Sequence, residues 1–503
     1  MRTKKAIMNM CAAMIYQIIA IICGLITPRL ILSNFGSTYN GVVSSATQFL
    51  SMISILTLGI TGATRVALYK TLNNNDVLGT SRIMKATKNY MRKVALCVIV
   101  YASILCFLYP FISHNDLTNA QNALLILIVS IGMFAQYFFG ISNQTLLQAD
   151  QASYVTYALD ILKTIANTIC VAILIKLNMS IYIVKLGSSI VFLFTPAIMN
   201  LYVKKKYKLI DNCKADYCGI KQRRDVAIHS IANLIHGNID LILLTIFVDA
   251  KIISVYTVYY LVVGKIKSLI QVVTSGMEAA FGSIWVKKEL KTLEKNFRGF
   301  EYLIYTFTVI VFSCVGILIL PFIERYTAGI SDIEYIRLDL AILITLAEGV
   351  FCIRQPYVIL VQATGNYKET RNGALIEAIL NLIISLMLVN FIGISGVIVG
   401  TLVANIFRTM QYTIFISNKV LHRNINEVLK RILWTVSSIG IICFLALIVV
   451  NNMIFNLDWS GWIIESVIVF SISCCIALIM SLIFYRKDLI FIINIIKRIS
   501  IKK

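Results

Sequence analysis

The sequence predicts an all-α, multi-pass membrane protein with about 14 transmembrane helices. Of its 503 residues, 58% are hydrophobic and only 14% are charged, and the mean hydropathy is +0.82. Soluble domains are about 45–50% apolar and about 25% charged, so the composition excludes an ordinary soluble enzyme and a disordered chain. At about 20 residues per bilayer-spanning helix, the apolar residues suffice for at most about 14 spans.

Apolar runs of helix length recur along the whole chain. The first run is too long for the apolar core of a signal peptide and lacks a clear cleavage site, so we interpret it as an uncleaved first span. The predicted spans are residues 7–32, 39–65, 93–112, 121–142, 156–176, 182–203, 227–248, 253–275, 301–323, 338–360, 372–392, 396–417, 432–453 and 461–484. Their even number places both termini on the same side of the membrane.

The distribution of basic residues indicates on which side of the membrane the termini lie. The chain has a formal net charge of +22, from 46 Lys and Arg against 24 Asp and Glu. Polar segments that share a side with the N-terminus hold 34 of the 46, around residues 2–5, 70–93, 204–224, 287–298, 368–371, 419–431 and 486–503. Cytoplasmic loops carry such an excess, so we expect a protein of the cytoplasmic membrane with both termini cytoplasmic. The charge is thus a topology signal, and we expect no nucleic-acid partner.

The long basic connection at residues 204–224 divides the spans into two sets. We predict a six-helix N-terminal lobe at 1–210 and a six-helix C-terminal lobe at 211–417. Residues 418–503 add two further transmembrane helices and an amphipathic cytoplasmic tail.

A faint internal repeat supports two related lobes. At an offset of 214 residues, Gln148-Ala149 recurs as Gln362-Ala363, Thr156 as Thr370, and Asn167 as Asn381. With six spans per lobe, the repeat is parallel, about an axis along the membrane normal. Transporters with such repeats bind substrate at the interface between the halves.

Motifs for catalysis are missing from the sequence. We find no Walker A loop, HExxH, GxSxG or kinase set, and the predicted external segments are short. Cys213 and Cys218 lie in a basic loop without zinc-ligand spacing, and we interpret all twelve cysteines as reduced thiols. We therefore expect no catalytic residue, metal site or cofactor, and a protein that moves a substrate rather than making one.

Basic residues inside the predicted spans are the candidate substrate-binding residues. A cation near the bilayer centre costs about 2.5–3.5 kcal/mol on insertion scales, so it normally faces a bundle interior or an aqueous cavity. Lys265 and Arg408 are the deepest, each about 18 Å from a span end, and neither has a carboxylate three or four residues away. Lys267 lies about 200° around the helix from Lys265, so we expect only one of them to face a cavity. The remaining candidates are Arg29, Arg65, Lys163 and Arg354, of which Arg29 and Arg65 can equally reach the interface.

Intramembrane acids are fewer, and two of them, Asp240 and Glu377, are candidates for ion or proton coupling together with His236. His236 and Asp240 are four residues apart on one helix face, which fits either a coupling element or a structural hydrogen bond. Glu377 occupies the position that corresponds to Lys163 in the repeat. An ion pair between their two helices is therefore an alternative. Asp160 lies three residues before Lys163, and the two can neutralise each other locally.

The first two spans and the start of the second half carry a family resemblance. The motifs are residues 28–36 (PRLILSNFG), 39–41 (YNG), 58–60 (LGI) with Arg65, and then Asp240, Tyr256 and Lys265. They resemble the pattern of Wzx-type polysaccharide flippases, in the multidrug/oligosaccharidyl-lipid/polysaccharide exporter superfamily. The sequence departs from the usual pattern in placing Arg29 directly after Pro28, with Leu at position 32.

The resemblance implies two six-helix lobes around a cationic cavity, with two further helices, working by alternating access. It also implies that the substrate is a polyprenyl-pyrophosphate-linked oligosaccharide, carried to the outer leaflet for surface polysaccharide export. Expected partners are this lipid-linked glycan, membrane lipids, and a polysaccharide polymerase with its assembly proteins. Three alternatives remain: a lipid II flippase, a multidrug exporter, which would favour an acidic cavity, and a membrane glycosyltransferase or polysaccharide polymerase.

Overall fold

The structure is a computed structural model that describes residues 2–57, 59–210, 212–217, 224–453 and 458–501. Within these residues nearly every position is helical and there is no strand beyond one isolated bridge between His114 and Asp249. The predicted all-α fold class is therefore confirmed. The helices form two compact units, residues 1–257 with 329–333 (unit 1) and residues 258–328 with 334–503 (unit 2). The predicted lobe boundaries at 210 and 417 stay a prediction.

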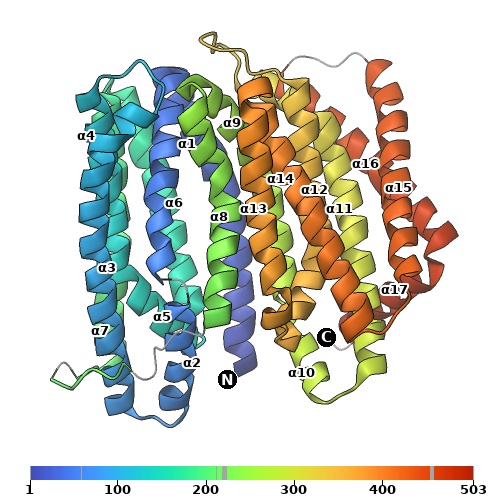
Figure 1. The fold of residues 1–503 in the computed structure, drawn as a ribbon, viewed down its shortest axis with the longest axis horizontal. Coiled ribbons are helices and arrows are strands. Elements are labelled where there is room, and N and C mark those ends of the chain that lie inside the picture. Colours follow the sequence, from blue (N-terminus) through green and yellow to red (C-terminus); the bar gives the residue numbers. More distant parts are fainter. Residues whose placement is uncertain (1, 58, 211, 218–223, 454–457, 502–503) are drawn as a thin grey trace. The chain divides into compact units, whose positions relative to one another are not determined.

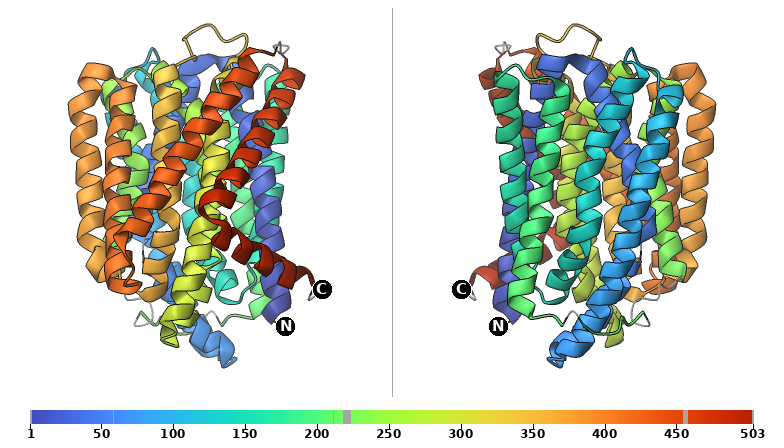
Figure 2. Two further views of the ribbon diagram at one scale, coloured as in Figure 1. Left: turned by 90° about the vertical axis from the view of Figure 1, so that its right-hand side faces the viewer. Right: turned by 90° about the vertical axis from the view of Figure 1, so that its left-hand side faces the viewer.

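Unit 1 contains the N-terminal helices. The first is a 50-residue helix that bends at Gly36, whose φ of 83° lies in the left-handed region that favours glycine. The elements are α1 (Arg2–Ser51), η1 (Met52–Thr57), α2 (Ile60–Asn73), α3 (Val77–Ile112), α4 (Asn119–Ala135), η2 (Gln136–Gly140), α5 (Ile141–Ala149), α6 (Ser153–Lys176), α7 (Ile181–Tyr207), α8 (Arg224–Phe247) and the first turns of α9 (Ala250–Ser275). Figure 2 shows α3, α4, α6 and α7 along one flank of this unit.

Unit 2 contains the rest of α9 and the C-terminal helices. They are α10 (Glu278–Val286), α11 (Leu290–Tyr326), α12 (Leu338–Thr364), α13 (Tyr367–Ile392), α14 (Ile394–Phe415), η4 (Ile416–Val420), α15 (Ile425–Asn451), α16 (Trp459–Phe484) and α17 (Arg486–Ile501). The final helix, α17, is amphipathic and turns away from the axis of α16 (Figure 2).

Most predicted spans lie within one helix of the structure; span 121–142 runs across α4, η2 and the start of α5. Among the described residues, eleven helical segments are long and apolar enough to cross a membrane, and residues 237–247 are a shorter apolar stretch at the end of α8. The predicted span 39–65 is the main departure. It is broken by η1 and by Gly59, whose φ is 79°, before α2 begins.

Polar contacts tie one end of unit 1 together around Asp150. The carboxylate of Asp150, in the α5–α6 turn, accepts hydrogen bonds from Lys5 of α1 at 3.2 Å and from Tyr207 of α7 at 2.7 Å. Burial alone would raise the pKa of the Asp150 carboxyl, but the bonds from Tyr207 and Lys5 outweigh it and hold that pKa below its ordinary value. The amide of Ile210 donates to Ser81 at the start of α3. The basic segments of unit 1 therefore gather at one end, the lower end in Figure 1.

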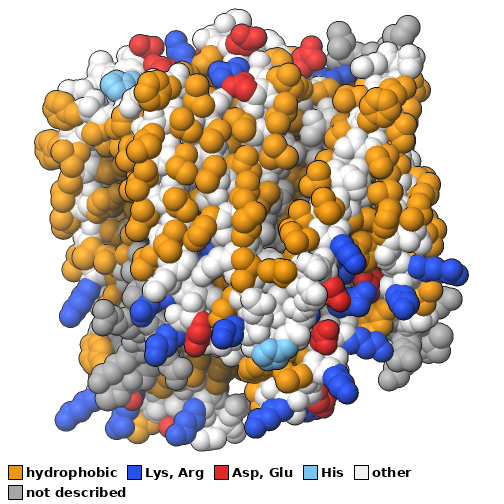
Figure 3. Space-filling model, turned by 45° about the vertical axis from the view of Figure 1, so that its right-hand side comes forward, with side chains coloured by type: hydrophobic (Ala, Val, Ile, Leu, Met, Phe, Trp, Pro, Cys, Tyr) orange, Lys and Arg blue, Asp and Glu red, His pale blue; other side chains and the backbone are white. Residues whose placement is uncertain are grey.

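Unit 2 has a corresponding basic end. Glu301 of α11, 1% exposed, accepts bonds from both guanidinium nitrogens of Arg423 at 2.6 and 2.9 Å. Arg431 of α15 lies 3.1 Å from Glu301 and donates to Asp488 of α17 at 3.0 Å. These buried pairs fasten α15 and α17 to α11. On the face drawn in Figure 3, hydrophobic side chains cover the height of the helices, and Lys and Arg gather at the lower end.

The internal repeat has a structural counterpart at two places. The Gln-Ala pairs end α5 and lie near the end of α12, and each is followed by a left-handed residue, Gln151 at φ 56° and Gly365 at φ 76°. These two residues are themselves 214 positions apart. Asn40 and Ser254 are also separated by 214 residues, and the Asn40 amide donates to the Ser254 hydroxyl at 2.9 Å.

Candidate functional site in the membrane-spanning helices

The most buried charges among the candidates lie where α12, α13 and α14 meet. Arg354 of α12 donates to Glu377 of α13, with 2.5 Å between Nη1 and Oε1. The second carboxylate oxygen of Glu377 lies 3.3 Å from Nε of Arg408 on α14. The three side chains are at most 6% exposed. Two guanidinium groups therefore share one carboxylate, and the cluster carries one net positive charge.

Arg408 is held entirely by protein groups. It donates to the carbonyl of Thr370 at 2.9 Å and to the hydroxyl of Tyr412 at 2.7 Å, it contacts Gln411, and its guanidinium lies 4.0 Å from the Tyr412 ring centroid. Arg408 has no carboxylate three or four residues away on its own helix, but Glu377 on α13 is its partner, and spacing along one helix does not reveal such a pair. Direct contact of Arg408 or Arg354 with a substrate stays a prediction.

A second ion pair joins α9 to α12. Lys267 lies 2.9 Å from Glu348, and its ammonium is 3.9 Å from the ring centroid of Phe351. The Arg354 guanidinium lies 4.7 Å from the same ring, so Phe351 stands between the two ion pairs. A cation over an aromatic face gains attraction from the ring quadrupole, about 2 kcal/mol or more where water is excluded.

Lys265 differs from Lys267, two residues away on α9. Its side chain is half-buried, and within the part of the chain that the structure describes it makes no hydrogen bond or ion pair. The two lysines thus have distinct environments, as the helical rotation between them predicts. Of the four candidate cations Lys265, Lys267, Arg354 and Arg408, Lys265 is the one without an ion-pair partner among the described residues.

In unit 1 the candidate cation Lys163 is paired locally. Its ammonium lies 2.5 Å from Asp160, one turn earlier on α6. The predicted i,i+3 neutralisation is therefore confirmed. Because Glu377 is paired with Arg354 and Arg408, both members of the alternative Lys163–Glu377 pair have partners in their own units.

The remaining candidates lie on α1, α2 and α8. Arg29 and Arg65 are half-buried. Asp240 accepts a hydrogen bond from the Tyr256 hydroxyl at 3.4 Å. The side chain of His236 lies outside the described residues, so the His236–Asp240 pair stays a prediction. No group of three or more His, Cys, Asp or Glu that could hold a metal ion occurs in the described part of the chain.

The cluster around Glu301 was not predicted from the sequence. Arg423 and Arg431 were expected only as cytoplasmic charges, whereas both are buried against Glu301. The one available signal was an acid at the first position of a predicted span, beside strongly basic loops. Such a position is equally typical of an exposed helix end.

Comparison with solved structures shows a shared fold. The lipid II flippase MurJ in an inward closed conformation superposes with a TM-score of 0.70 at 17% identity, over 96% of this chain and all (100%) of that chain. An inward-facing multidrug resistance MATE family transporter of the MOP superfamily gives 0.62 at 13% identity, over 79% and 95%.

A third similar structure is a MOP superfamily transporter from Pyrococcus furiosus, described as having a binding pocket of reverse polarity. It gives a TM-score of 0.54 at 13% identity, over 84% of this chain and 97% of that chain. No protein-family model matches the sequence, and no curated protein matches it either. At these identities the likeness establishes the fold, which is that of MATE and MurJ transporters.

Proposed function

We propose that this protein is a flippase that carries a polyprenyl-pyrophosphate-linked oligosaccharide repeat unit across the cytoplasmic membrane by alternating access, for surface polysaccharide export. The observation that carries the proposal is Lys265, an intramembrane ammonium without a carboxylate partner among the described residues. The shared fold with transporters supports movement of a substrate rather than its synthesis.

The charge balance of unit 2 fits an anionic substrate. Among the described residues, two carboxylates, Glu348 and Glu377, are paired with this group of four cations, Lys265, Lys267, Arg354 and Arg408, so the group carries a net charge of +2. A buried charge needs a partner or water. A diphosphate supplies that partner, and Lys binds phosphate as a compact point charge.

The substrate's other parts fit a membrane transporter. Its sugars are polar and need a hydrated cavity, while its polyprenyl tail remains stable in lipid. Because the sequence has no nucleotide-binding motif, an ion gradient, the membrane potential or removal of the product drives transport in this proposal. Asp240 with His236 is the proposed coupling element.

Lipid II is the second candidate substrate. The MurJ structure favours it, since that likeness covers nearly the whole of both chains. Lipid II shares the diphosphate and the polyprenyl tail, so the cation argument applies equally and only the glycan differs. A multidrug exporter fits less well, because cationic drugs favour an acidic cavity and not a surplus of intramembrane cations.

Substitution of Lys265 tests the proposal. We expect Lys265→Ala to lose most transport, Lys265→Arg to keep part of it because the charge is retained, and Lys265→Glu to be worst because it repels the diphosphate. The measurement is restoration of surface glycan in a flippase-deficient strain, with the membrane level of each variant determined in parallel.

A matched control is Lys291→Ala, which removes an exposed lysine near the start of α11 in the same unit. It should transport as the unaltered protein does. Normal surface glycan from well-expressed Lys265→Ala and Lys265→Glu variants would contradict the assignment.

The lipid-linked intermediate that accumulates in a deficient strain distinguishes the two candidate substrates from each other and a flippase from a glycosyltransferase or polymerase. A flippase defect leaves complete lipid-linked units on the inner leaflet: repeat units if the proposal is right, and lipid II if the second candidate is right. A glycosyltransferase or polymerase defect instead leaves incomplete or unjoined units. Mass spectrometry of lipid-linked intermediates from the deficient strain distinguishes these outcomes.

A further inference from the structure

Unit 1 contains a basic pocket that the transport proposal does not use. It lies between α3, η2–α5 and α7 and has a volume of about 410 Å³. Four cations line it, Lys85, Lys88 and Arg92 from α3 and Lys204 from α7, and none of its described lining residues is acidic. The three α3 residues are spaced i, i+3 and i+7, so they share one helix face.

The clustering of these cations needs an explanation. Lys85 and Lys88 each have a further interaction within the protein, whereas Arg92 and Lys204 bring two like charges from facing helices, and like charges repel. The predicted cytoplasmic location accounts for basic residues at this end of the helices, but not for their convergence on one cavity. An anionic ligand would offset the repulsion.

The polar floor of the pocket provides an amide donor. Asn143 of α5 is 1% exposed and donates to the carbonyl of Phe139 at 2.8 Å and to Oδ1 of Asn200 on α7 at 3.2 Å. The Asn200 oxygen accepts this bond, and the amide NH₂ of Asn200 can donate to a ligand. Both asparagines line the pocket.

An aromatic wall completes the site. The Arg92 guanidinium lies 5.4 Å from the ring centroid of Phe138, and Phe138 packs edge-on against Phe139 at 4.6 Å. Both rings come from η2, a single π-helical turn between α4 and α5, and such turns are frequent at functional sites. A guanidinium held on a ring keeps its in-plane N–H groups available for bidentate contact with a phosphate.

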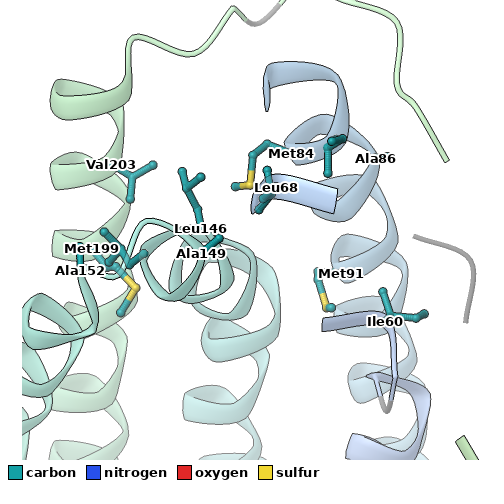
Figure 4. Packing of buried hydrophobic residues seen from close by; sticks show 12 residues of the cluster. Ile60, Leu68, Met84, Ala86, Met91, Leu146, Ala149, Ala152, Met199 and Val203 are labelled. Carbon is teal, nitrogen blue, oxygen red and sulfur yellow. The ribbon is translucent and has the colours of Figure 1, made fainter. Parts of the chain in front are cut away.

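The helices that form the pocket are fixed by packing. A buried cluster that includes Leu68, Met84, Leu146, Met199 and Val203 joins α2, α3, α5 and α7 (Figure 4). Met84 belongs to this cluster and also lines the pocket. The walls are therefore positioned before any ligand binds, which reduces the ordering cost of binding.

We infer that this pocket binds the phosphate headgroup of an anionic membrane lipid. Basic pockets between transmembrane helices at the cytoplasmic side take such headgroups. Phe139 lines the pocket and is also 39% exposed, so the wall continues into an exposed apolar surface. A lipid with acyl chains uses that surface, whereas free phosphate does not. The inference does not depend on which substrate the protein transports.

Adjacent lysines and arginines provide matched variants. Arg92→Gln and Lys204→Gln each remove one pocket cation, and Lys93→Gln and Lys205→Gln remove exposed neighbours that do not line the pocket. The full-length protein is titrated in detergent with phosphatidylglycerol, with phosphatidylcholine and with inorganic phosphate, and binding is measured by native mass spectrometry and by the shift in thermal unfolding.

We expect phosphatidylglycerol to bind and phosphatidylcholine to bind far more weakly. Arg92→Gln and Lys204→Gln should each weaken phosphatidylglycerol binding by about tenfold, the loss expected for one charge-assisted hydrogen bond, while Lys93→Gln and Lys205→Gln leave it unchanged. Arg92→Lys, which keeps the charge, should retain part of the binding and provides a test if Arg92→Gln does not fold.

Three results would overturn the inference. They are equal binding of the two lipids, equal loss in pocket and neighbour variants, and full displacement of phosphatidylglycerol by millimolar inorganic phosphate, which would identify a site for the free ion. Because the readout is binding and not transport, a failed transport assay with Lys265 variants leaves this test unaffected.

Discussion

Glu377 joins three helices of unit 2 because its carboxylate is shared by Arg354 and Arg408. Its side chain is 3% exposed, so water does not replace either partner. Removing one member of a buried ion pair leaves an uncompensated buried charge, at a cost of about 3–5 kcal/mol. Here the loss of Glu377 leaves two such charges within one packed cluster.

We therefore expect Glu377→Ala to destabilise the protein by about 3–5 kcal/mol. The measurement is thermal unfolding of the purified protein in detergent. Glu369→Ala removes an exposed carboxylate from the same helix and should change stability little. Equal unfolding temperatures for the two variants would show that the Glu377 cluster contributes nothing to stability.

The sequence identified the members of this cluster but not its connections. Arg354, Glu377 and Arg408 were recognisable because charged residues are rare in apolar spans. Their pairing depends on which faces of α12, α13 and α14 meet, and hydropathy along the chain does not determine that. For the same reason, the sequence did not predict the ion pairs of Glu301. Its partners Arg423 and Arg431 come from the turn before α15 and from α15 itself.

Close approach of α13 and α14 depends on two glycines. Gly396 and Gly400 are four residues apart on α14, the small-xxx-small spacing that lets membrane helices pack tightly. A Cβ atom on Gly396 would lie 2.5 Å from backbone atoms of Leu388 on α13. Backbone atoms cannot move aside as a flexible side chain can, so the two helices would have to separate.

Gly396→Ala should therefore destabilise the protein by about 1–3 kcal/mol, the usual cost of overpacking. Gly440 of α15 is a matched control, because nothing lies within 4 Å of a Cβ built there. Gly440→Ala should be neutral or stabilising by about 0.5–1 kcal/mol through helix propensity. Thermal unfolding of both variants checks this; similar effects would rule out tight packing at Gly396.

Helices were predictable where apolar runs were long and uninterrupted, as in α11 and α16. The irregular pieces η1, η2 and α10 were not, because each continues or adjoins an apolar run and depends on packing in the folded protein. Gly59 marks the break before α2, yet glycine is common in transmembrane helices and by itself does not predict an interruption.

Within each unit, the basic residues gather at one end of the helices. The Asp150 contacts join the N-terminus, the α5–α6 turn and the end of α7, and the Glu301 contacts join α11, α15 and α17. The alternation of basic and non-basic loops along the chain predicts this arrangement. The assignment of these ends to the cytoplasm rests on the positive-inside rule.

Accessibility of single cysteines tests that assignment for unit 1. Cys213 lies in the segment after α7, and Cys218, outside the described residues, follows it in the same basic connection. In variants that retain only Cys213 or only Cys218, a membrane-impermeant thiol reagent should label neither in intact cells. Both should react after permeabilisation, because the basic connection is retained on the cytoplasmic side.

The opposite end of unit 1 supplies the positive control. Ser331 is exposed in the loop between α11 and α12, and the neighbouring Asp332 accepts hydrogen bonds from Ser37 at the bend of α1. Since α1 rises from the Asp150 end to this bend, a Ser331→Cys substitution in a protein without other cysteines should react in intact cells. Labelling of Cys213 but not of residue 331 would invert the topology. It would also place the basic pocket at the outer leaflet, against the rule from which both expectations derive.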